Sequence, residues 1–191
     1  MSRSAIVLAG GRSARMGRDK GKLVLRGRSL VAHAVAACRD RGGCDHVVVV
    51  APHLPDDLPP GSALLALEHP PFGGPVAGLA AGLAALPPAQ PDGEVLVLAC
   101  DLPRVAEIVS LLTTAELGTD GTCLVDSGDV PQYLAGRYCR RSLTSALPAE
   151  VDGAALKSTL SGLRLRLVPA PGLTSDVDTP AQADAFGVRL D

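Results

Sequence analysis

Short apolar runs alternate along the chain with segments whose apolar positions recur at helical spacing. Three runs are almost entirely apolar, at 4–8, 46–51 and 94–100. Runs of this kind are typical of parallel strands that are buried on both faces. Helices are predicted between them, over 30–38 with Ser29 as its cap and over 76–86 with Pro75 before it. This alternation predicts an α/β fold with a single doubly wound, mostly parallel sheet.

The second half of the chain is predicted to complete the same sheet. The expected elements are a helix over 103–112, strands over 122–126 and 132–138, a short helix within 153–162, a strand over 163–168 and a final helix capped by Asp178 or Thr179. Polar and apolar residues alternate over 163–168, as in a half-exposed strand, so we expect the sheet to have an antiparallel edge. Residues 52–75 hold seven prolines and three glycines, which predicts an extended loop with one short strand at 63–67.

The composition describes one globular domain over residues 1–191. Hydrophobic residues make up 47% of the chain, and 18 Lys and Arg stand against 20 Asp and Glu, which argues against disorder. No apolar stretch reaches the roughly 18–20 residues that cross a bilayer, and the first residues lack a signal-peptide pattern. We therefore expect a cytoplasmic protein with no membrane partner. Five cysteines without a CxxC pair argue against structural zinc, and only four aromatic residues argue against nucleic acid as a partner.

Positive charge is concentrated at the start of the chain. Residues 1–28 hold eight basic residues and one acidic residue, which favours a local site for a small polyanion. In the loop after the first strand, Gly10 and Gly11 let backbone amides approach phosphate oxygens, and Arg15 and Lys20 can neutralise a triphosphate. The loop matches neither G-x-x-x-x-G-K-[ST] nor G-x-G-x-x-G. From glycine and charge alone, a solvated basic loop is an equal alternative.

The wider pattern resembles that of a known family. The segment LAGGRSARMGRDKGKL at 8–23 is similar to the signature LAGGxSxRMGxDKxxL of the MobA-like nucleotidyltransferases, the family of molybdenum cofactor guanylyltransferases and their relatives. Further segments resemble those of the family in the same order: GGPVAGL at 73–79, VLACDLP at 97–103, QYLAGRY at 132–138 and DVDTPAQAD at 176–184. The resemblance implies a Rossmann-like nucleotidyltransferase fold and an enzyme that uses GTP and a molybdopterin-type acceptor.

The resemblance also implies a nucleotide site made largely of loop residues. It assigns the base and ribose to the backbone of Leu8, Ala9 and Gly10, and the triphosphate to Arg15 and Lys20 as catalytic residues. Gly11 is a further candidate nucleotide-binding residue of the same loop. Gly74 and Pro75 would flank the base, although a Gly-Pro helix start by itself more often serves packing. Glu68 stands near the place where the family commonly has an aspartate that contacts the nucleotide. Either Glu68 takes that part or the contact is lost.

Two aspartates are the candidate ligands of Mg²⁺. Asp101 follows the strand over 94–100, at the end of a sheet where α/β folds bind ligands, and its hard oxygen suits Mg²⁺ between phosphates. The resemblance implies that Asp101 binds the metal and contributes to catalysis, and that Asp178 completes the metal site. Each residue has a structural alternative as the cap of the helix that follows it.

The reaction that these assignments imply is guanylyl transfer. The terminal phosphate of the acceptor attacks the α-phosphorus of GTP, and pyrophosphate leaves. The alternatives are a cytidylyltransferase, a sugar- or polyol-phosphate nucleotidyltransferase, or a non-catalytic nucleotide-binding relative. The segments at 8–11 and 74–75 favour GTP over CTP, whereas residues 154–158 lack the family's basic cluster, which leaves the acceptor open. We expect a monomer that makes transient contacts with cofactor-synthesis or acceptor proteins.

Overall fold

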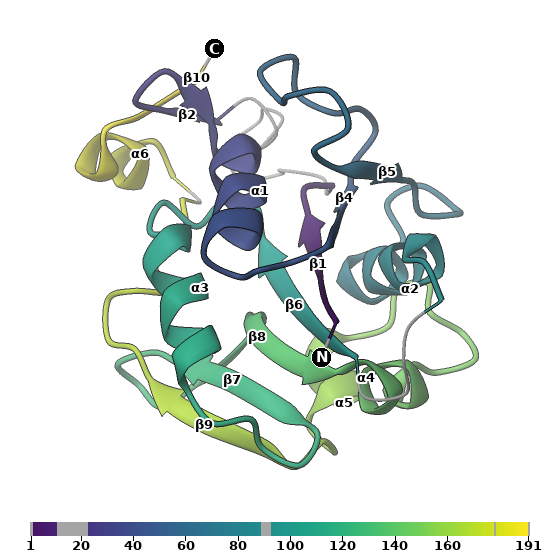
Figure 1. Cartoon of the computed structure of the whole chain (residues 1–191). Helices are drawn as coiled ribbons and strands as arrows, with labels where there is room; N and C mark the ends of the chain where they lie inside the picture. Colours follow the sequence, from purple (N-terminus) through teal and green to yellow (C-terminus); the bar gives the residue numbers. More distant parts are fainter. Residues whose placement is uncertain (1, 11–22, 89–92, 178, 191) are drawn as a thin grey trace.

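One large sheet organises the structure (Figure 1). The computed structural model describes residues 2–10, 23–88, 93–177 and 179–190. Its elements in chain order are β1 (Arg3–Leu8), β2 (Leu23–Leu25), β3 (Arg28–Ser29), α1 (Leu30–Asp40), β4 (His46–Val50), β5 (Leu64–Ala66), α2 (Pro75–Ala85), β6 (Glu94–Ala99), α3 (Val105–Thr114), β7 (Gly121–Val125), β8 (Pro131–Cys139), α4 (Arg140–Ala146), α5 (Leu156–Leu160), β9 (Leu165–Pro169), α6 (Pro180–Phe186) and β10 (Val188–Leu190). Seven strands form the large sheet in the order β5-β4-β1-β6-β8-β7-β9.

Helices cover both faces of this sheet. Ala5 and Val7 of β1 pack in one apolar cluster with α1 and α3, whereas Ile6 and Leu8 pack in a second cluster with α2, α4 and α5. Successive side chains of a strand point to opposite faces, so a run with no polar break is what a strand between two helical layers requires. The α/β class and the mostly parallel, doubly wound sheet are therefore confirmed.

The antiparallel strand does not lie at an edge, which corrects that part of the expectation. It is β8, which pairs antiparallel with β6 on one side and with β7 on the other. A tight turn between β7 and β8 forces the two strands to run in opposite directions. The strand predicted at 163–168 is β9, which lies at the edge as expected, but α4 and α5 return the chain so that β9 runs parallel to β7.

A second, three-stranded sheet was not expected from the sequence. Its order is β10-β2-β3, and it packs with α6 around Leu23, Val177 and Val188. The turn between β2 and β3 places Arg26 at φ 51°, and both Arg26 and Arg28 are exposed. The strands escaped prediction because they are only two or three residues long.

The predicted helix caps are present at both ends of the chain. Ser29 Oγ accepts a hydrogen bond from Ala32 N at 3.0 Å, and Ser29 N and Oγ each donate to the carboxylate of Asp57 at 2.7 Å. Thr179 caps α6 by accepting from Gln182 N at 3.3 Å. These contacts satisfy amide groups that the first turn of a helix leaves without partners. Within the described residues, every helix is too short or too polar to cross a membrane.

The close packing of α2 on β1 depends on glycine. A Cβ atom at Gly82 would lie 2.6 Å from Cγ2 of Ile6, which is fully buried. Alanine favours a helix over glycine by about 1 kcal/mol, but overpacking a buried β-branched side chain costs about 1–3 kcal/mol. Gly82→Ala is therefore expected to lower the free energy of unfolding, as measured by chemical denaturation. Gly162→Ala, at an open position, is the control, and an equal effect of the two substitutions would contradict the packing explanation.

Asp120 ties the turn before β7 to the start of β9. Its carboxylate accepts hydrogen bonds from Arg164 Nε at 3.0 Å, Arg164 N at 2.9 Å and Ser142 Oγ at 2.8 Å. The contacts with Arg164, aided by Ser142, lower the pKa of Asp120 to about 2. Because the carboxyl has a pKa of about 3.9 in an unfolded chain, this contribution to stability is present above about pH 4 and is lost as the pH falls toward about 2.

We therefore expect the unfolding temperature of the wild type to exceed that of Asp120→Asn near pH 6, and the difference to shrink below about pH 4. Differential scanning calorimetry of both proteins across this pH range measures the difference. A gap that stays constant down to about pH 2.5 would show that ionisation of Asp120 is not its source.

Candidate active site

The carboxyl ends of four parallel strands lie at one edge of the large sheet. Leu8 is in register with Val50 of β4 and with Ala99 of β6, and Val50 is in register with Ala66 of β5. The pairing continues past the strand ends, since Ala9 N donates to Val50 O at 2.9 Å and Cys100 N donates to Leu8 O at 3.0 Å. Loops that follow parallel strands at such an edge are where open α/β sheets bind ligands.

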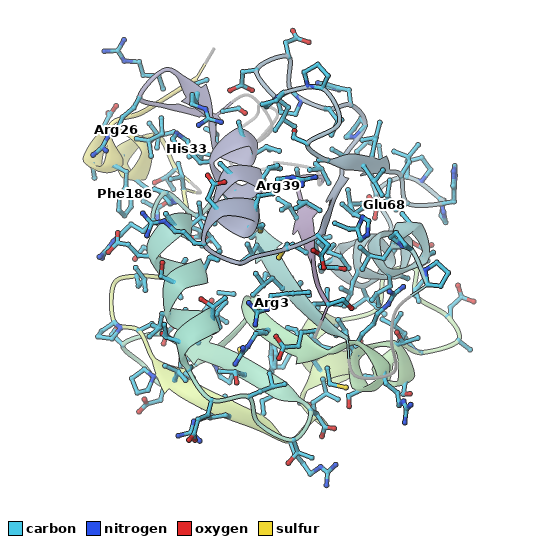
Figure 2. All side chains as sticks on the ribbon, viewed as in Figure 1. Arg3, Arg26, His33, Arg39, Glu68 and Phe186 are labelled. Carbon is cyan, nitrogen blue, oxygen red and sulfur yellow. The ribbon has the colours of Figure 1, made fainter. Side chains whose placement is uncertain are left out.

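Glu68 lies where the ends of β1 and β5 meet α2, as Figure 2 shows. Its side chain is buried, at 9% exposure. A Cβ atom at Gly10 would lie 3.8 Å from Glu68 Oε1, and one at Gly78 would lie 3.9 Å from Oε2. The carboxylate therefore faces the backbone of the β1 loop with one oxygen and that of α2 with the other. Gly10 is exposed, so its backbone stays open beside this carboxylate, whereas Gly78 is buried against Leu8.

The loop from β5 to α2 turns around the same carboxylate. Phe72 N donates a hydrogen bond to Glu68 Oε1 at 2.9 Å. Gly74 then begins α2 as its N-cap with φ 93° and ψ −179°, a conformation that essentially requires glycine. Pro75 is the first residue of the helix. The first turn of α2 and Gly10 thus lie on either side of the Glu68 carboxylate, and the dipole of the helix favours negative charge there.

Gly73 has a packing role. A Cβ atom there would lie 2.8 Å from Ala77 Cβ and 2.8 Å from Asp152 Oδ1, and Gly73 O accepts a hydrogen bond from Gly153 N at 2.8 Å. The packing alternative considered for the Gly-Pro helix start therefore applies to the glycine before it. Gly74 serves the backbone turn instead.

Asp101 follows β6 at the same edge. It is buried, at 6% exposure, and its backbone oxygen accepts a hydrogen bond from Val177 N at 3.1 Å. That contact brings the acidic segment around Asp176 against the end of β6. The N-cap of α3 is Arg104, with no side-chain cap, so Asp101 does not serve as the cap of the next helix.

The structure thus brings Leu8, Ala9, Gly10, Glu68 and Asp101 to one edge of the sheet, with Gly74 and Pro75 at the adjacent helix start. Four further predicted residues, Gly11, Arg15, Lys20 and Asp178, lie outside the described residues. Their assignments stay predictions.

Comparison with known proteins gives this edge a family. The model of the MobA-like NTP transferase domain matches residues 5–166, which contain every described residue named above for the site except the segment at 176–177. The chain belongs to the MobA-like NTP transferase family. A molybdenum cofactor guanylyltransferase from Pseudomonas putida is 32% identical over 168 residues, which are 84% of this chain and 85% of that protein.

Other relatives support the same membership. A probable molybdenum cofactor guanylyltransferase from Nostoc is 30% identical over 93% of this chain and 86% of its own length. Among solved structures, a nucleotidyl transferase from Methanothermobacter thermautotroptrophicus superposes with a TM-score of 0.71, covers 97% of both chains and is 21% identical. At that identity the likeness concerns the fold alone.

The residues of this family member fit a divalent cation that is held jointly with a substrate. Within the described ranges, no group of three or more His, Cys, Asp and Glu side chains could hold a metal by itself. Mg²⁺ in phosphoryl-transfer sites usually needs only one or two carboxylates, because substrate phosphates and waters supply the other oxygens. Asp101, buried at a sheet edge beside the 176–177 segment, is a suitable carboxylate.

Reasoning from the sequence did not identify Gly78 or Phe72 as neighbours of Glu68. The signal for Gly78 is its spacing, because Gly74, Gly78 and Gly82 recur every four residues and therefore line one face of α2. That face lies against Leu8 and Ile6 of β1. No sequence pattern around Phe72 indicates its contact with Glu68, apart from its position next to Gly73.

Proposed function

We propose that this chain transfers GMP from GTP to the phosphate of molybdopterin or the molybdenum cofactor, with release of pyrophosphate. The observation that carries the proposal is the meeting of Leu8–Gly10, Glu68 and Asp101 at one sheet edge in a MobA-like NTP transferase. The relatives from Pseudomonas and Nostoc are named as guanylyltransferases, which favours GTP over CTP and favours an enzyme over a non-catalytic relative.

In this reaction the protein has to position the two substrates and to stabilise negative charge. An oxygen of the acceptor's terminal phosphate forms a bond to the α-phosphorus of GTP, and the bond from that phosphorus to the bridging oxygen of the β-phosphate breaks. The electron pair leaves with pyrophosphate. A phosphate monoester dianion is already a nucleophile near neutral pH, so the proposed site needs no general base. Negative charge gathers on the phosphoryl oxygens, and cations placed there in advance lower the barrier.

The proposed roles combine the positions of the described residues with the family resemblance of the others. Backbone atoms of Leu8, Ala9 and Gly10 contact the base and ribose, where glycine leaves the backbone open. Arg15 and Lys20 are proposed to neutralise the triphosphate, Arg15 with the bidentate geometry that suits phosphate. Gly11 is proposed to extend the backbone contacts of the loop. The monomeric state and the transient contacts with cofactor-synthesis or acceptor proteins both stay predictions.

Glu68 is proposed to take the place of the aspartate that the family commonly has near this position. Its Oε1 is engaged by Phe72 N, and its Oε2 faces α2 at Gly78. The buried carboxylate can accept a hydrogen bond from a nucleotide that lies over the backbone of Gly10. The carboxylate also keeps the 68–74 loop in place.

Asp101 is proposed to hold Mg²⁺, with Asp178 as the second carboxylate. When bound, Mg²⁺ supplies Lewis-acid polarisation of the phosphates. Asp101 lies two residues after Ala99, which is in register with Leu8, and Cys100 N donates to Leu8 O, so the paired ends of β1 and β6 hold Asp101 beside the residues proposed to contact the nucleotide.

A nucleotide panel tests the proposed function. Thermal unfolding is measured with GTP, CTP, ATP and UTP, each with and without Mg²⁺, because a ligand that binds only the native state raises the unfolding temperature. GTP is expected to give the largest shift, and the part that depends on Mg²⁺ is expected to vanish in Asp101→Ala. A preference for CTP would move the assignment to cytidylyl transfer, and no response to any nucleotide would contradict nucleotidyl transfer.

A further inference from the structure

Phe72 is an exposed aromatic residue in a strained conformation. Its side chain is 54% exposed, more than any other large hydrophobic side chain in the described part of the chain. Its backbone has φ 68°, a left-handed conformation that bulky residues rarely adopt. More than half of the side chain is accessible to a ligand, and the backbone conformation adds strain. Such residues gather at functional sites, where the surrounding structure holds them in place.

The contacts around Phe72 fix the position of its backbone on both sides. Phe72 N donates to Glu68 Oε1 at 2.9 Å. On the other side, Gly73 O accepts from Gly153 N at 2.8 Å, and Gly74 begins α2. The ring therefore projects from a loop whose two ends are tied to the sheet edge and to the 152–153 turn. An aromatic side chain in a preorganised position can bind a flat ligand at low entropic cost.

The carboxylate that binds Phe72 N is the one that faces Gly10. Phe72 is thus linked through a single side chain to the backbone that the proposed function assigns to the nucleotide. We propose that Phe72 provides an aromatic face for the purine ring of the bound nucleotide, an inference that rests on the proposed function. The link through Glu68 favours the purine over the other flat heterocycle of the reaction, the pterin of the acceptor.

Calorimetric titration of the whole protein with two probes tests this inference. GTP with Mg²⁺ carries the ring, and inorganic tripolyphosphate carries comparable charge without it. Phe72→Ala is expected to raise the Kd for GTP about tenfold, the usual size of a base stacked on an aromatic side chain. The Kd for tripolyphosphate is expected to be unchanged. Phe72→Tyr keeps an aromatic face and is expected to bind GTP within about twofold of the wild type.

Leu67→Ala is the matched control. Leu67 is also an exposed apolar residue of this loop region, at 45% exposure, but it has an ordinary backbone conformation. Its replacement is expected to leave the Kd for GTP unchanged. Melting temperatures of all variants show that the fold is intact.

Three results would overturn the inference. If Phe72→Ala binds GTP as the wild type does, the ring does not contact the purine. If in that case the substitution raises only the KM for the acceptor, the ring contacts the pterin instead. If tripolyphosphate binding weakens equally, Phe72 only shapes the loop. A wild type that binds no nucleotide would contradict the proposed function itself, whereas GTP binding unaffected by Phe72→Ala contradicts only the stacking contact.

Discussion

Asp101→Asn is expected to lower kcat for nucleotidyl transfer by about 10²–10³-fold, the usual effect of removing one preorganised contact to developing charge. Asparagine keeps the size of the side chain but removes the negative charge that holds a divalent cation. Asp101 is buried at 6% exposure, and its backbone contact with Val177 N does not depend on the carboxylate. The variant is therefore expected to fold. Pyrophosphate release from GTP in the presence of the acceptor measures the rate.

Asp45→Asn is the control for this experiment. Asp45 is an exposed carboxylate before β4, at the amino edge of the sheet, so its loss removes the same charge far from the proposed site. Turnover is expected to be unchanged in Asp45→Asn. Turnover within about threefold of the wild type in Asp101→Asn would remove Asp101 from the catalytic machinery, because the loss expected for a metal-binding carboxylate is much larger.

The parallel core of the fold could be predicted because each of its strands has a recognisable local sequence pattern. β1, β4 and β6 are each nearly free of polar residues, and strands that are covered on both faces need such runs. Their helices were equally visible, since Ser29 and Pro75 mark the starts of α1 and α2. Parallel strands share one carboxyl edge, so the place of the candidate site could be predicted from the sequence.

The position of β8 could not be predicted, because strand order depends on contacts between distant parts of the chain. Residues 132–138 show a strand, but nothing in them says that β8 inserts between β6 and β7. The small sheet escaped for a different reason. Val188 and Leu25 pair across most of the length of the chain, and a three-residue strand has too few positions to show a period. α4 was not predicted either, because it begins directly at the end of β8 and has no capping side chain to mark its start.

The residues of the candidate site could be predicted from their types and positions in the sequence, but the contacts between them could not. Glu68 is a candidate because it stands near an expected aspartate, but no local pattern indicates that its two oxygens face Gly10 and Gly78. The hydrogen bond from Phe72 N to Glu68 also depends on how the loop folds back after β5. Similarly, Val177 meets Asp101 only because the chain returns to the end of β6. These contacts join segments that share no local pattern.

Glu94→Gln is expected to lower the free energy of unfolding by about 3 kcal/mol or more, because it leaves a buried arginine without its counter-charge. Glu94 Oε2 lies 2.8 Å from Arg3 Nη2 and 3.5 Å from Arg137 Nη1 at the amino edge of the sheet. The side chains of Glu94 and Arg137 are 8% and 6% exposed. Burial lowers the pKa of Arg137, and the charge of Glu94 opposes that shift. Urea denaturation measures the loss.

This effect is expected to arise from the charge left on Arg137 rather than from one lost hydrogen bond. If so, Arg137→Met in the Glu94→Gln background recovers part of the lost stability, because it removes the unpaired charge and keeps an apolar side chain in its place. Glu107→Gln, which breaks the exposed pair with Arg104, is the control and is expected to change stability little, since solvent screens exposed pairs. Glu94 and Arg137 lie at the opposite edge of the sheet from Asp101, so Glu94→Gln is expected to bind GTP under conditions in which it is folded. The explanation would be wrong if Glu94→Gln lowered the free energy of unfolding by less than about 1 kcal/mol, or if the double variant were less stable than Glu94→Gln alone.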